Sequence, residues 1–363
     1  MNNLYTSLGK RTLFSIDAEM AHGLSITALR LGLHPRVAAD VDPRLAVSIA
    51  GLEFPNPLGM AAGYDKNGEV PDALLKMGFG HAEIGTVTPL PQPGNAKPRI
   101  FRLQSDQGVI NRLGFNSKGH NQTRANLQSR TGRSGIVGIN LGANKTSTDF
   151  AADYVSGIHK FADLATYFTV NISSPNTPGL RALQKADQLS DLLQRVGEAR
   201  REQVAKHGRS IPLFLKIAPD LEDPELDDIA ATLTKSDADA LIVSNTTLAR
   251  DGLTSKYRDQ VGGLSGKPLF ERSTIILAKM RLRLPTDFPL IGVGGIHSAE
   301  TAFAKIEAGA NLVQLYSGMV YQGPGLPGAI LNGLRQQCDE ENLTNISQAV
   351  GRSAKDWANI KLG

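Results

Sequence analysis

From residue 57 onward, short apolar runs alternate with longer stretches in which apolar residues recur at helical spacing. Each run ends in glycine or a small polar residue, as a buried strand does where it passes into a loop. Strands that alternate with helices pair in parallel, and eight of them within about 260 residues favour a closed barrel over an open sheet. The pattern therefore predicts an α/β fold, a (β/α)8 TIM barrel, with strands at 57–63, 81–87, 135–142, 167–173, 212–219, 240–247, 289–295 and 312–318.

The intervals between these runs are expected to form helices, such as one at 187–207. Two intervals, 88–134 and 248–288, are too long for a single helix, and long excursions of this kind often cover a binding site. Within the first interval, 98–103 and 108–115 have the composition of strands. We therefore expect a small antiparallel cover over the catalytic face of the barrel.

Two helical stretches are expected before the barrel, at about 4–14 and 17–32, with Asp17 as the N-cap of the second. Such a pair could lie on a membrane surface or line an entrance for an apolar substrate. Periodicity alone favours a third interpretation, in which the pair simply packs against the barrel. The apolar residues at helical spacing are Ala18, Ala21, Ile26, Leu29 and Leu33, and the basic residues near them are Lys10, Arg11, Arg30 and Arg36.

Composition narrows the possible functions. The chain has 363 residues and a formal net charge of +4, but its basic residues are interspersed with acidic ones and only 6% of residues are aromatic, so no nucleic-acid surface and no metal site are predicted. No apolar run approaches the roughly 18 to 20 residues of a membrane span, and the start lacks a signal-peptide core.

We divide the chain into a helical segment at 1–40, a barrel at 41–337 and a polar tail at 338–363. Near the start of the tail, we expect Cys338 at an exposed helix end.

The most distinctive polar segment, 171–181 (NISSPNTPGLR), directly follows an apolar run. Because TIM barrels carry their catalytic residues at the carboxyl ends of strands, Ser174 and its neighbours are candidates for catalysis. Two other strand ends are rich in glycine, 292–295 (GVGG) and 316–318 (YSG). Loops after the seventh and eighth barrel strands commonly bind phosphate through backbone N–H groups, so a phosphorylated cofactor or substrate is expected.

Lysines and asparagines supply further candidates. Lys66 and Lys216 stand near strand ends, where a charge must be paired or functional. Each could hold an anion, whereas Lys216 could also form a Schiff base or pair with a carboxylate such as Asp220. Uncharged amides at corresponding positions suit a flat ligand that carries amides of its own. These asparagines are Asn111, Asn140, Asn171, Asn176 and Asn245.

Nine motifs can be read together: 61–66 (AAGYDK), 83–88 (EIGTVT), 91–94 (PQPG), 111–115 (NRLGF), 171–181, 216–219 (KIAP), 244–247 (SNTT), 262–266 (GGLSG) and 292–296 (GVGGI). They closely resemble those of the quinone-dependent (class 2) dihydroorotate dehydrogenases, and the resemblance extends over about residues 1–330. It implies an FMN enzyme of de novo pyrimidine synthesis that oxidises (S)-dihydroorotate to orotate and passes the electrons to a membrane quinone.

The resemblance also implies residue roles. Ser174 would be the base that removes the C5 proton while hydride leaves C6 for the flavin, with Thr177 and Phe115 shaping a proton path. The implied substrate contacts are Lys66, Asn111, Arg112, Leu113, Gly114, Phe115, Asn171, Asn176, Asn245 and Thr246. The implied FMN contacts are Ala62, Gly63, Tyr64, Asp65, Lys66, Thr86, Asn140, Asn171, Lys216, Ser244, Gly266, Gly295, Tyr316 and Ser317. Tyr64 stands where relatives often have phenylalanine or leucine, so its hydroxyl needs a partner.

In class 2 enzymes the N-terminal region forms a quinone tunnel and docks on the membrane. The resemblance therefore implies a peripheral protein on the cytoplasmic face of a bacterial inner membrane. Two other functions stay open: a phosphate-binding lyase or aldolase with Lys216 as Schiff-base nucleophile, and a non-catalytic module that binds flavin or docks on membranes. A bound flavin argues against the first, and reduction of that flavin by dihydroorotate argues against the second.

Overall fold

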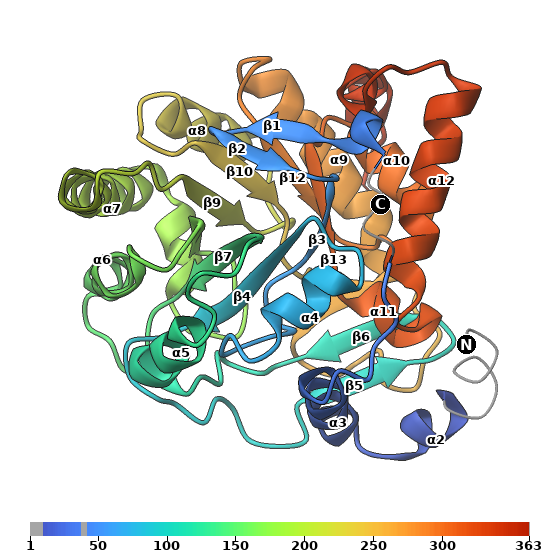
Figure 1. Ribbon diagram of the computed structural model, residues 1–363, viewed down its shortest axis with the longest axis horizontal. Coiled ribbons are helices and arrows are strands. Elements are labelled where there is room, and N and C mark those ends of the chain that lie inside the picture. Colours follow the sequence, from blue (N-terminus) through green and yellow to red (C-terminus); the bar gives the residue numbers. More distant parts are fainter. Residues whose placement is uncertain (1–9, 38–41, 363) are drawn as a thin grey trace.

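A computed structural model of the chain describes residues 10–37 and 42–362, in which eight parallel strands close into a barrel (Figure 1). Closure is complete because β10 (Ala240–Val243) pairs on one side with β9 (Leu213–Ile217) and on the other with β12 (Leu290–Val293). The remaining barrel strands are β3 (Leu58–Met60), β4 (His81–Val87), β7 (Ile136–Leu141), β8 (Tyr167–Asn171) and β13 (Leu312–Leu315). Every strand lies within one of the eight predicted runs, so the predicted TIM barrel is confirmed.

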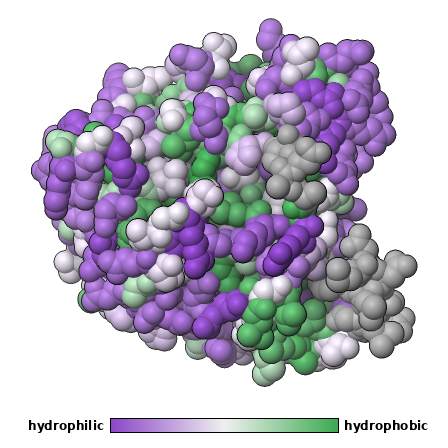
Figure 2. All heavy atoms as spheres, in the orientation of Figure 1, coloured by the Kyte–Doolittle hydropathy of each residue, from purple (hydrophilic) through white to green (hydrophobic). Residues whose placement is uncertain are grey.

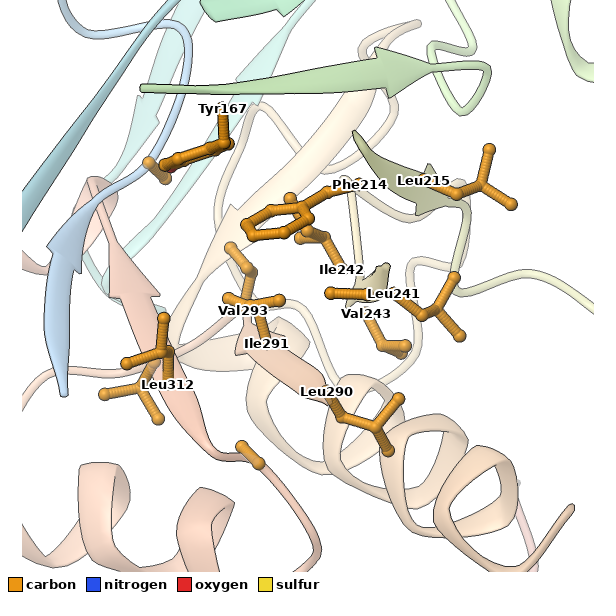
Figure 3. Close-up of a cluster of buried hydrophobic side chains, with 14 of the residues drawn as sticks. Tyr167, Phe214, Leu215, Leu241, Ile242, Val243, Leu290, Ile291, Val293 and Leu312 are labelled. Carbon is orange, nitrogen blue, oxygen red and sulfur yellow. The ribbon is translucent and has the colours of Figure 1, made fainter. Parts of the chain in front are cut away.

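The barrel strands are buried on both faces, which explains why they appear in the sequence as apolar runs without alternation. Inside the barrel the Tyr167 ring stacks on Phe214, with 4.5 Å between ring centroids. Figure 3 shows these two rings pointing toward one another, with side chains of β10 and β12 around them. This close-packed interior holds the strand ends, and therefore the site that they carry, in fixed positions.

Helices surround the barrel between consecutive strands (Figure 1). Their ends have the expected caps: the Ser298 side chain accepts a hydrogen bond from a backbone N–H at the start of α10 (Ala299–Glu307), and α7 (Ala186–His207) ends at Gly208 in the left-handed conformation. The other outer helices are α4 (Pro71–Lys76), α5 (Gly119–Gln128), α6 (Phe150–Phe161), α8 (Asp223–Leu233), α9 (Phe270–Arg283), α11 (Ser317–Gln322) and α12 (Leu326–Glu340).

Two small sheets lie at opposite ends of the barrel. An unpredicted hairpin of β1 (Val47–Ile49) and β2 (Leu52–Phe54) packs at the amino end, where Phe54 contacts the edge of His81 on β4. At the mouth, the predicted antiparallel cover is confirmed and consists of β5 (Ile100–Leu103), β6 (Gly108–Asn111) and β11 (Gly263–Gly266). β11 was missed because this short, glycine-rich strand comes from the second long interval.

The N-terminal region forms α2 (Lys10–Ser15) and α3 (Ala18–Arg30). Asp17 is the N-cap of α3, as predicted, and accepts hydrogen bonds from two backbone N–H groups. The part of the first predicted helix at residues 4–9 lies outside the described residues. Figure 2 shows hydrophobic side chains gathered over α3. Four large hydrophobic residues in α3 and the segment that follows it are exposed. They are Met20, Leu24, Leu31 and Leu33. No described helix is both long enough and apolar enough to cross a membrane.

The C-terminal segment packs against the barrel. Cys338 lies within α12 and is fully buried, so its expected place at an exposed helix end was wrong. The prediction failed because the polar residues beside Cys338 occupy the solvent side of α12 while the thiol faces the core. Beyond it, α13 (Ala354–Ala358) packs on α9, where the rings of Trp357 and Phe270 meet edge to face at 5.9 Å.

Candidate active site

The carboxyl ends of the barrel strands open into a cavity of about 580 Å³. Its walls come from three parts of the fold: the strand ends with their loops, the cover sheet, and the helices α2 and α3. Cofactor and ligand sites in proteins commonly measure ~300–1,000 Å³. The cavity is therefore large enough for a cofactor together with a small substrate.

Amide and hydroxyl groups of three adjacent strands form a polar floor at the barrel end of this cavity. Asn171 Nδ2, at the end of β8, donates to Thr86 Oγ1 at 2.9 Å and to Asn140 Oδ1 at 3.1 Å. The Thr86 hydroxyl donates to the same Asn140 oxygen at 2.6 Å, and Asn140 Nδ2 donates to Glu83 at 2.7 Å. Because each amide has partners on both sides, its orientation is fixed before any ligand binds.

Ser174 lies in the loop after β8, lines the cavity and is only 5% exposed. Its Oγ accepts a hydrogen bond from the Asn176 backbone N–H at 3.2 Å. Arg181 holds this loop from behind, since its guanidinium donates to the carbonyls of Ser173 at 3.1 Å and Thr246 at 3.2 Å. The loop is therefore fixed from both sides, and the Ser174 hydroxyl faces a small, largely closed space.

A second amide cluster joins the loops after β8 and β10. Asn245 Nδ2 donates to Ser173 Oγ at 2.9 Å, and Asn245 Oδ1 accepts from the Thr246 backbone N–H at 2.8 Å. The Ser173 hydroxyl in turn donates to Asn171 Oδ1 at 2.7 Å. This cluster connects Asn245 and Thr246 to the polar floor, so two loops from different strands form one continuous wall.

The cover contributes the segment 111–115. Phe115 has a left-handed backbone conformation (φ 52°), which is uncommon for a bulky residue and costs about 1–3 kcal/mol. Gln92 Nε2 donates to the Phe115 carbonyl at 2.9 Å, and Asn176 Nδ2 donates to the Asn111 carbonyl at 3.2 Å. These contacts hold the Phe115 ring and the Asn111 side chain at the cavity wall.

Lys66 lies where the barrel mouth meets α3. Its Nζ donates to the Gly63 carbonyl at 2.8 Å and lies 3.4 Å from His22 Nε2. Burial lowers the pKa of Lys66 to about 8, although the Glu19 carboxylate opposes this shift. The neighbouring Tyr64 hydroxyl donates to Ser25 Oγ at 3.0 Å, so the partner that Tyr64 requires comes from α3.

Lys216, on β9, is 4% exposed and lines the cavity. Burial lowers the pKa of its ammonium group, and the Glu83 carboxylate opposes that shift. Asp220, the carboxylate considered from the sequence as a partner for Lys216, instead pairs with Arg181 at 3.0 Å. Asp220 is therefore not the partner of Lys216, whose side chain lines the cavity.

Glycines form the wall at the ends of β11 and β12. Gly266 (φ 88°) and Gly295 (φ 76°) both have left-handed backbones, which strain any other residue. A Cβ atom at Gly295 would lie 2.4 Å from Phe270 Cα, so a side chain cannot fit there. Nearby, the hydroxyls of Ser265 and Ser317 are 2.8 Å apart. Backbone and small hydroxyl groups are thus exposed at the expected phosphate site.

Most residues selected from the sequence line this single cavity. Four do not: Arg112 donates to Gln260 and backbone carbonyls of the cover, Asp65 accepts from N–H groups of its own turn, Asn140 supports Thr86 and Asn171 of the polar floor from beneath, and Thr177 is buried within the Ser174 loop. The lining residues are Ala62, Gly63, Tyr64, Lys66, Thr86, Asn111, Leu113, Gly114, Phe115, Asn171, Ser174, Asn176, Lys216, Ser244, Asn245, Thr246, Gly266, Gly295, Tyr316 and Ser317.

Polar lining residues that the sequence analysis missed include His22, Arg102 and Gln314. The Arg102 guanidinium donates to the Leu13 carbonyl at 2.7 Å and lies over the Phe14 ring at 4.9 Å. In the sequence, Arg102 appears only as a charged residue within the apolar segment 100–103, and such a residue does not by itself indicate a ligand site. The contacts of His22 and Arg102 depend on how α2 and α3 dock against the barrel, whereas Gln314 lies on β13 and donates to Glu83 at 3.0 Å.

Comparison with known proteins identifies the family. Residues 44–338 match the family model described as "Dihydroorotate dehydrogenase". The chain belongs to this family. Proteins named "Dihydroorotate dehydrogenase (quinone)" from Brucella anthropi and Brucella melitensis are 60% identical to it over 363 residues, which covers 100% of this chain and of each relative. The resemblance to class 2 members is therefore confirmed.

Solved structures agree with the family assignment. The structure titled as DHODH of Eimeria tenella in complex with ferulenol superposes with a TM-score of 0.88 at 37% identity. The match covers 92% of this chain and 95% of that one. The two chains therefore share the same overall fold over most of their length.

Proposed function

We propose that this dihydroorotate dehydrogenase oxidises (S)-dihydroorotate to orotate, with FMN as hydride acceptor and a membrane quinone as final electron acceptor, in pyrimidine synthesis. One observation carries the proposal: a single cavity extends from the Ser174 loop to an apolar entrance between α2 and α3. Such a cavity brings a polar substrate and an apolar electron acceptor to opposite ends of one flat cofactor. The 60% identical relatives named for quinone support the same assignment. The names of these relatives favour the dehydrogenase over the alternative of a phosphate-binding lyase or aldolase.

The residues present fit FMN. The polar floor of Thr86 and Asn171 offers fixed groups to a flat ring, and Lys216 supplies a buried cation against the negative charge that reduction places on it. Gly295 and Ser317 lie at the strand ends where barrels bind phosphate. The proposed holding residues are Ala62, Gly63, Tyr64, Lys66, Thr86, Asn171, Lys216, Ser244, Gly266, Gly295, Tyr316 and Ser317. When bound, FMN supplies the hydride acceptor.

Ser174 is the proposed base for the C5 proton. A serine hydroxyl is a poor base in water, so it needs a closed pocket and a group that stabilises Oγ after it gives up its own proton. Its 5% exposure meets the first need, and the Asn176 N–H at 3.2 Å meets the second. Thr177, 4% exposed, and the Phe115 ring form the proposed path for the departing proton.

Lys66 and the amides bind the substrate in this proposal. The Lys66 ammonium faces the substrate carboxylate, while Asn111, Asn176 and Asn245 bind its ring amides through groups that both donate and accept. Leu113, Gly114 and Thr246 complete the wall on the cover side.

The quinone enters between α2 and α3. Leu13, Phe14, Ala21 and Leu24 form this apolar part of the wall. Of the exposed apolar residues in the α3 region, Leu24 and Leu33 line the cavity, whereas Met20 and Leu31 lie outside it. Arg30, at the end of α3, is 62% exposed and suits an anionic membrane surface. We place the protein at the cytoplasmic face of a bacterial inner membrane, attached peripherally through α2 and α3.

The test is a visible absorbance spectrum of the purified protein before and after anaerobic addition of dihydroorotate. The expected result is a flavin band that bleaches. Ser174→Ala should keep the band but slow bleaching by about 10²–10⁴-fold, the usual contribution of a general base. Ser129→Ala, at an exposed serine of the α5 end, is the control and should bleach at the wild-type rate. A colourless protein would exclude FMN, and unchanged bleaching in Ser174→Ala would exclude the base.

A further inference from the structure

Lys305 is a fully buried lysine in α10 that the proposed chemistry does not use. Its Nζ donates to Ser273 Oγ at 2.6 Å, and no Asp or Glu of the described chain forms an ion pair with it. An isolated ammonium in a protein interior is unfavourable unless an anion is near. Burial lowers the pKa of Lys305, and an anion bound close to it would oppose this shift and favour the charged form.

Lys305 of α10 lies behind the glycine loop at the end of β12, and Ser273 of α9 connects it to that loop. The Ser273 hydroxyl that accepts from Lys305 is 3.2 Å from the Gly294 carbonyl, and a Cβ at Gly294 would lie 2.6 Å from the same oxygen. The Lys305 ammonium also lies over the Phe270 ring at 5.3 Å, and the Phe270 backbone supports Gly295. The front of this loop lines the cavity.

The loop after the seventh strand is where TIM barrels bind phosphate. A phosphate at Gly294 and Gly295 would face solvent-poor protein on its far side, and charges interact strongly across such a region. The anion that Lys305 lacks among the described residues would then lie on the other side of a single layer of backbone.

We propose that Lys305 is a positioning residue for the cofactor phosphate: from behind the Gly294–Gly295 loop, it supplies a countercharge that favours a phosphorylated flavin. The inference rests on the proposed use of FMN at this site. Lys305 acts through the loop and does not touch the cofactor, so its effect is on the phosphate and not on the flavin ring.

The test compares FMN with riboflavin, which lacks the phosphate. The full chain is purified, its flavin is released by dialysis against bromide, and rebinding is followed by quenching of flavin fluorescence. Lys305→Met, a nearly isosteric neutral change, should weaken FMN binding by about tenfold or more. Its affinity for riboflavin should stay within about twofold of wild type, because only the phosphate interaction depends on the charge.

Two controls separate charge from structure. Lys305→Gln keeps a donor for Ser273 but lacks the charge, and should show the same selective loss. Lys279→Met removes a positive charge from α9 at a surface pair with Asp223, and should leave both affinities unchanged. Thermal unfolding checks that the variants fold, since replacing a buried charge with an apolar side chain is often neutral or stabilising.

Equal weakening of FMN and riboflavin binding in Lys305→Met would show a structural role and overturn the proposal, as would unchanged FMN binding. A wild-type chain that binds riboflavin as tightly as FMN would also overturn it. These outcomes differ from failure of the proposed function itself, in which the wild-type chain would bind neither flavin.

Discussion

Burial determines how the two basic side chains at the cavity mouth behave. Lys66 and His22 are 3.4 Å apart, and they lie 44 positions apart in the sequence. Burial and the Lys66 charge lower the pKa of His22 to about 3, whereas the pKa of Lys66 falls only to about 8. At neutral pH the pair therefore carries one positive charge, located on Lys66.

That charge predicts how substrate binding depends on pH. If Lys66 binds the dihydroorotate carboxylate, it does so only when protonated. The KM for dihydroorotate should be constant below about pH 7.5 and should rise above pH 8, by up to about tenfold per pH unit, as Lys66 loses its proton. Steady-state kinetics between pH 6 and 9.5 measures this.

Lys66→Met is the matched variant for this profile. Its KM should be high at pH 7 and should not change between pH 6 and 9.5, because the titrating group is gone. A wild-type KM that stays level up to pH 9.5 would contradict the prediction, as would a rise of the same size in the variant.

Individual site residues could be predicted where a local motif contains them, and missed where long-range packing places them. Ser174 and Asn171 belong to one contiguous segment, which the sequence alone identifies as a strand end opening into a polar loop. His22 is a single histidine in an amphipathic helix, and nothing near it in the chain indicates that it contacts Lys66. Its place depends on the docking of α3, which no local pattern encodes.

At the scale of elements, α3 is attached to the cover by a buried ion pair. Arg99 is 6% exposed and forms two hydrogen bonds with Glu19, Nη2 to Oε1 at 2.7 Å and Nε to Oε2 at 3.0 Å. Arg99 also donates to the carbonyls of Pro93 and Asn95 on the cover side. The proposed quinone entrance is therefore formed by a helix that is anchored separately from the polar floor.

Separate anchoring predicts that the two half-reactions can be separated. Deleting residues 1–36 should abolish quinone reduction while the flavin is still reduced by dihydroorotate, because the Ser174 loop and polar floor come from the barrel. Rapid mixing measures flavin reduction and reoxidation independently. Equal loss of both rates would argue against a tunnel role for α2 and α3.

A pair of point variants tests the same entrance with the helix in place. Ala28 lines the cavity whereas its neighbour Thr27 faces solvent. Ala28→Phe should slow reoxidation by a soluble short-chain quinone without changing flavin reduction. Thr27→Phe adds a similar ring on the other face and should leave both steps near the wild-type rate.

The sequence identified elements that repeat and missed those that depend on a partner. Eight apolar runs alternate with helical stretches along the chain, so each barrel strand supports the interpretation of the others. β1, β2 and β11 contain only three or four residues each and form through pairing with another short strand, such as Gly263 of β11 opposite Asn111 of β6. The barrel strand β3 is equally short, but it belongs to the alternation of strands and helices along the chain, which β1, β2 and β11 do not share.

For the whole molecule, three buried histidines dominate the expected response to mild acid. Burial lowers the pKa of His22 and His81 to about 3 and that of His120 to about 4. Within the described chain, His81 Nδ1 and His120 Nε2 have no hydrogen-bond partner. A proton added to either nitrogen would therefore have no protein group to accept a hydrogen bond from it. Native protein should therefore keep all three rings neutral at pH 5.

The unfolded chain binds protons at these histidines near pH 6.5, so below that pH it binds more protons than the native state and stability falls with decreasing pH. Each histidine should cost up to about 2 kcal/mol of unfolding free energy between pH 7 and 5. Urea unfolding at pH 7 and pH 5 measures this difference in unfolding free energy. Most paired carboxylates keep their charge between these pH values, so they contribute little to the difference. His120→Gln should reduce the loss by about one histidine's share. Equal wild-type stability at pH 5 and 7 would mean that the buried rings accept protons in the folded state.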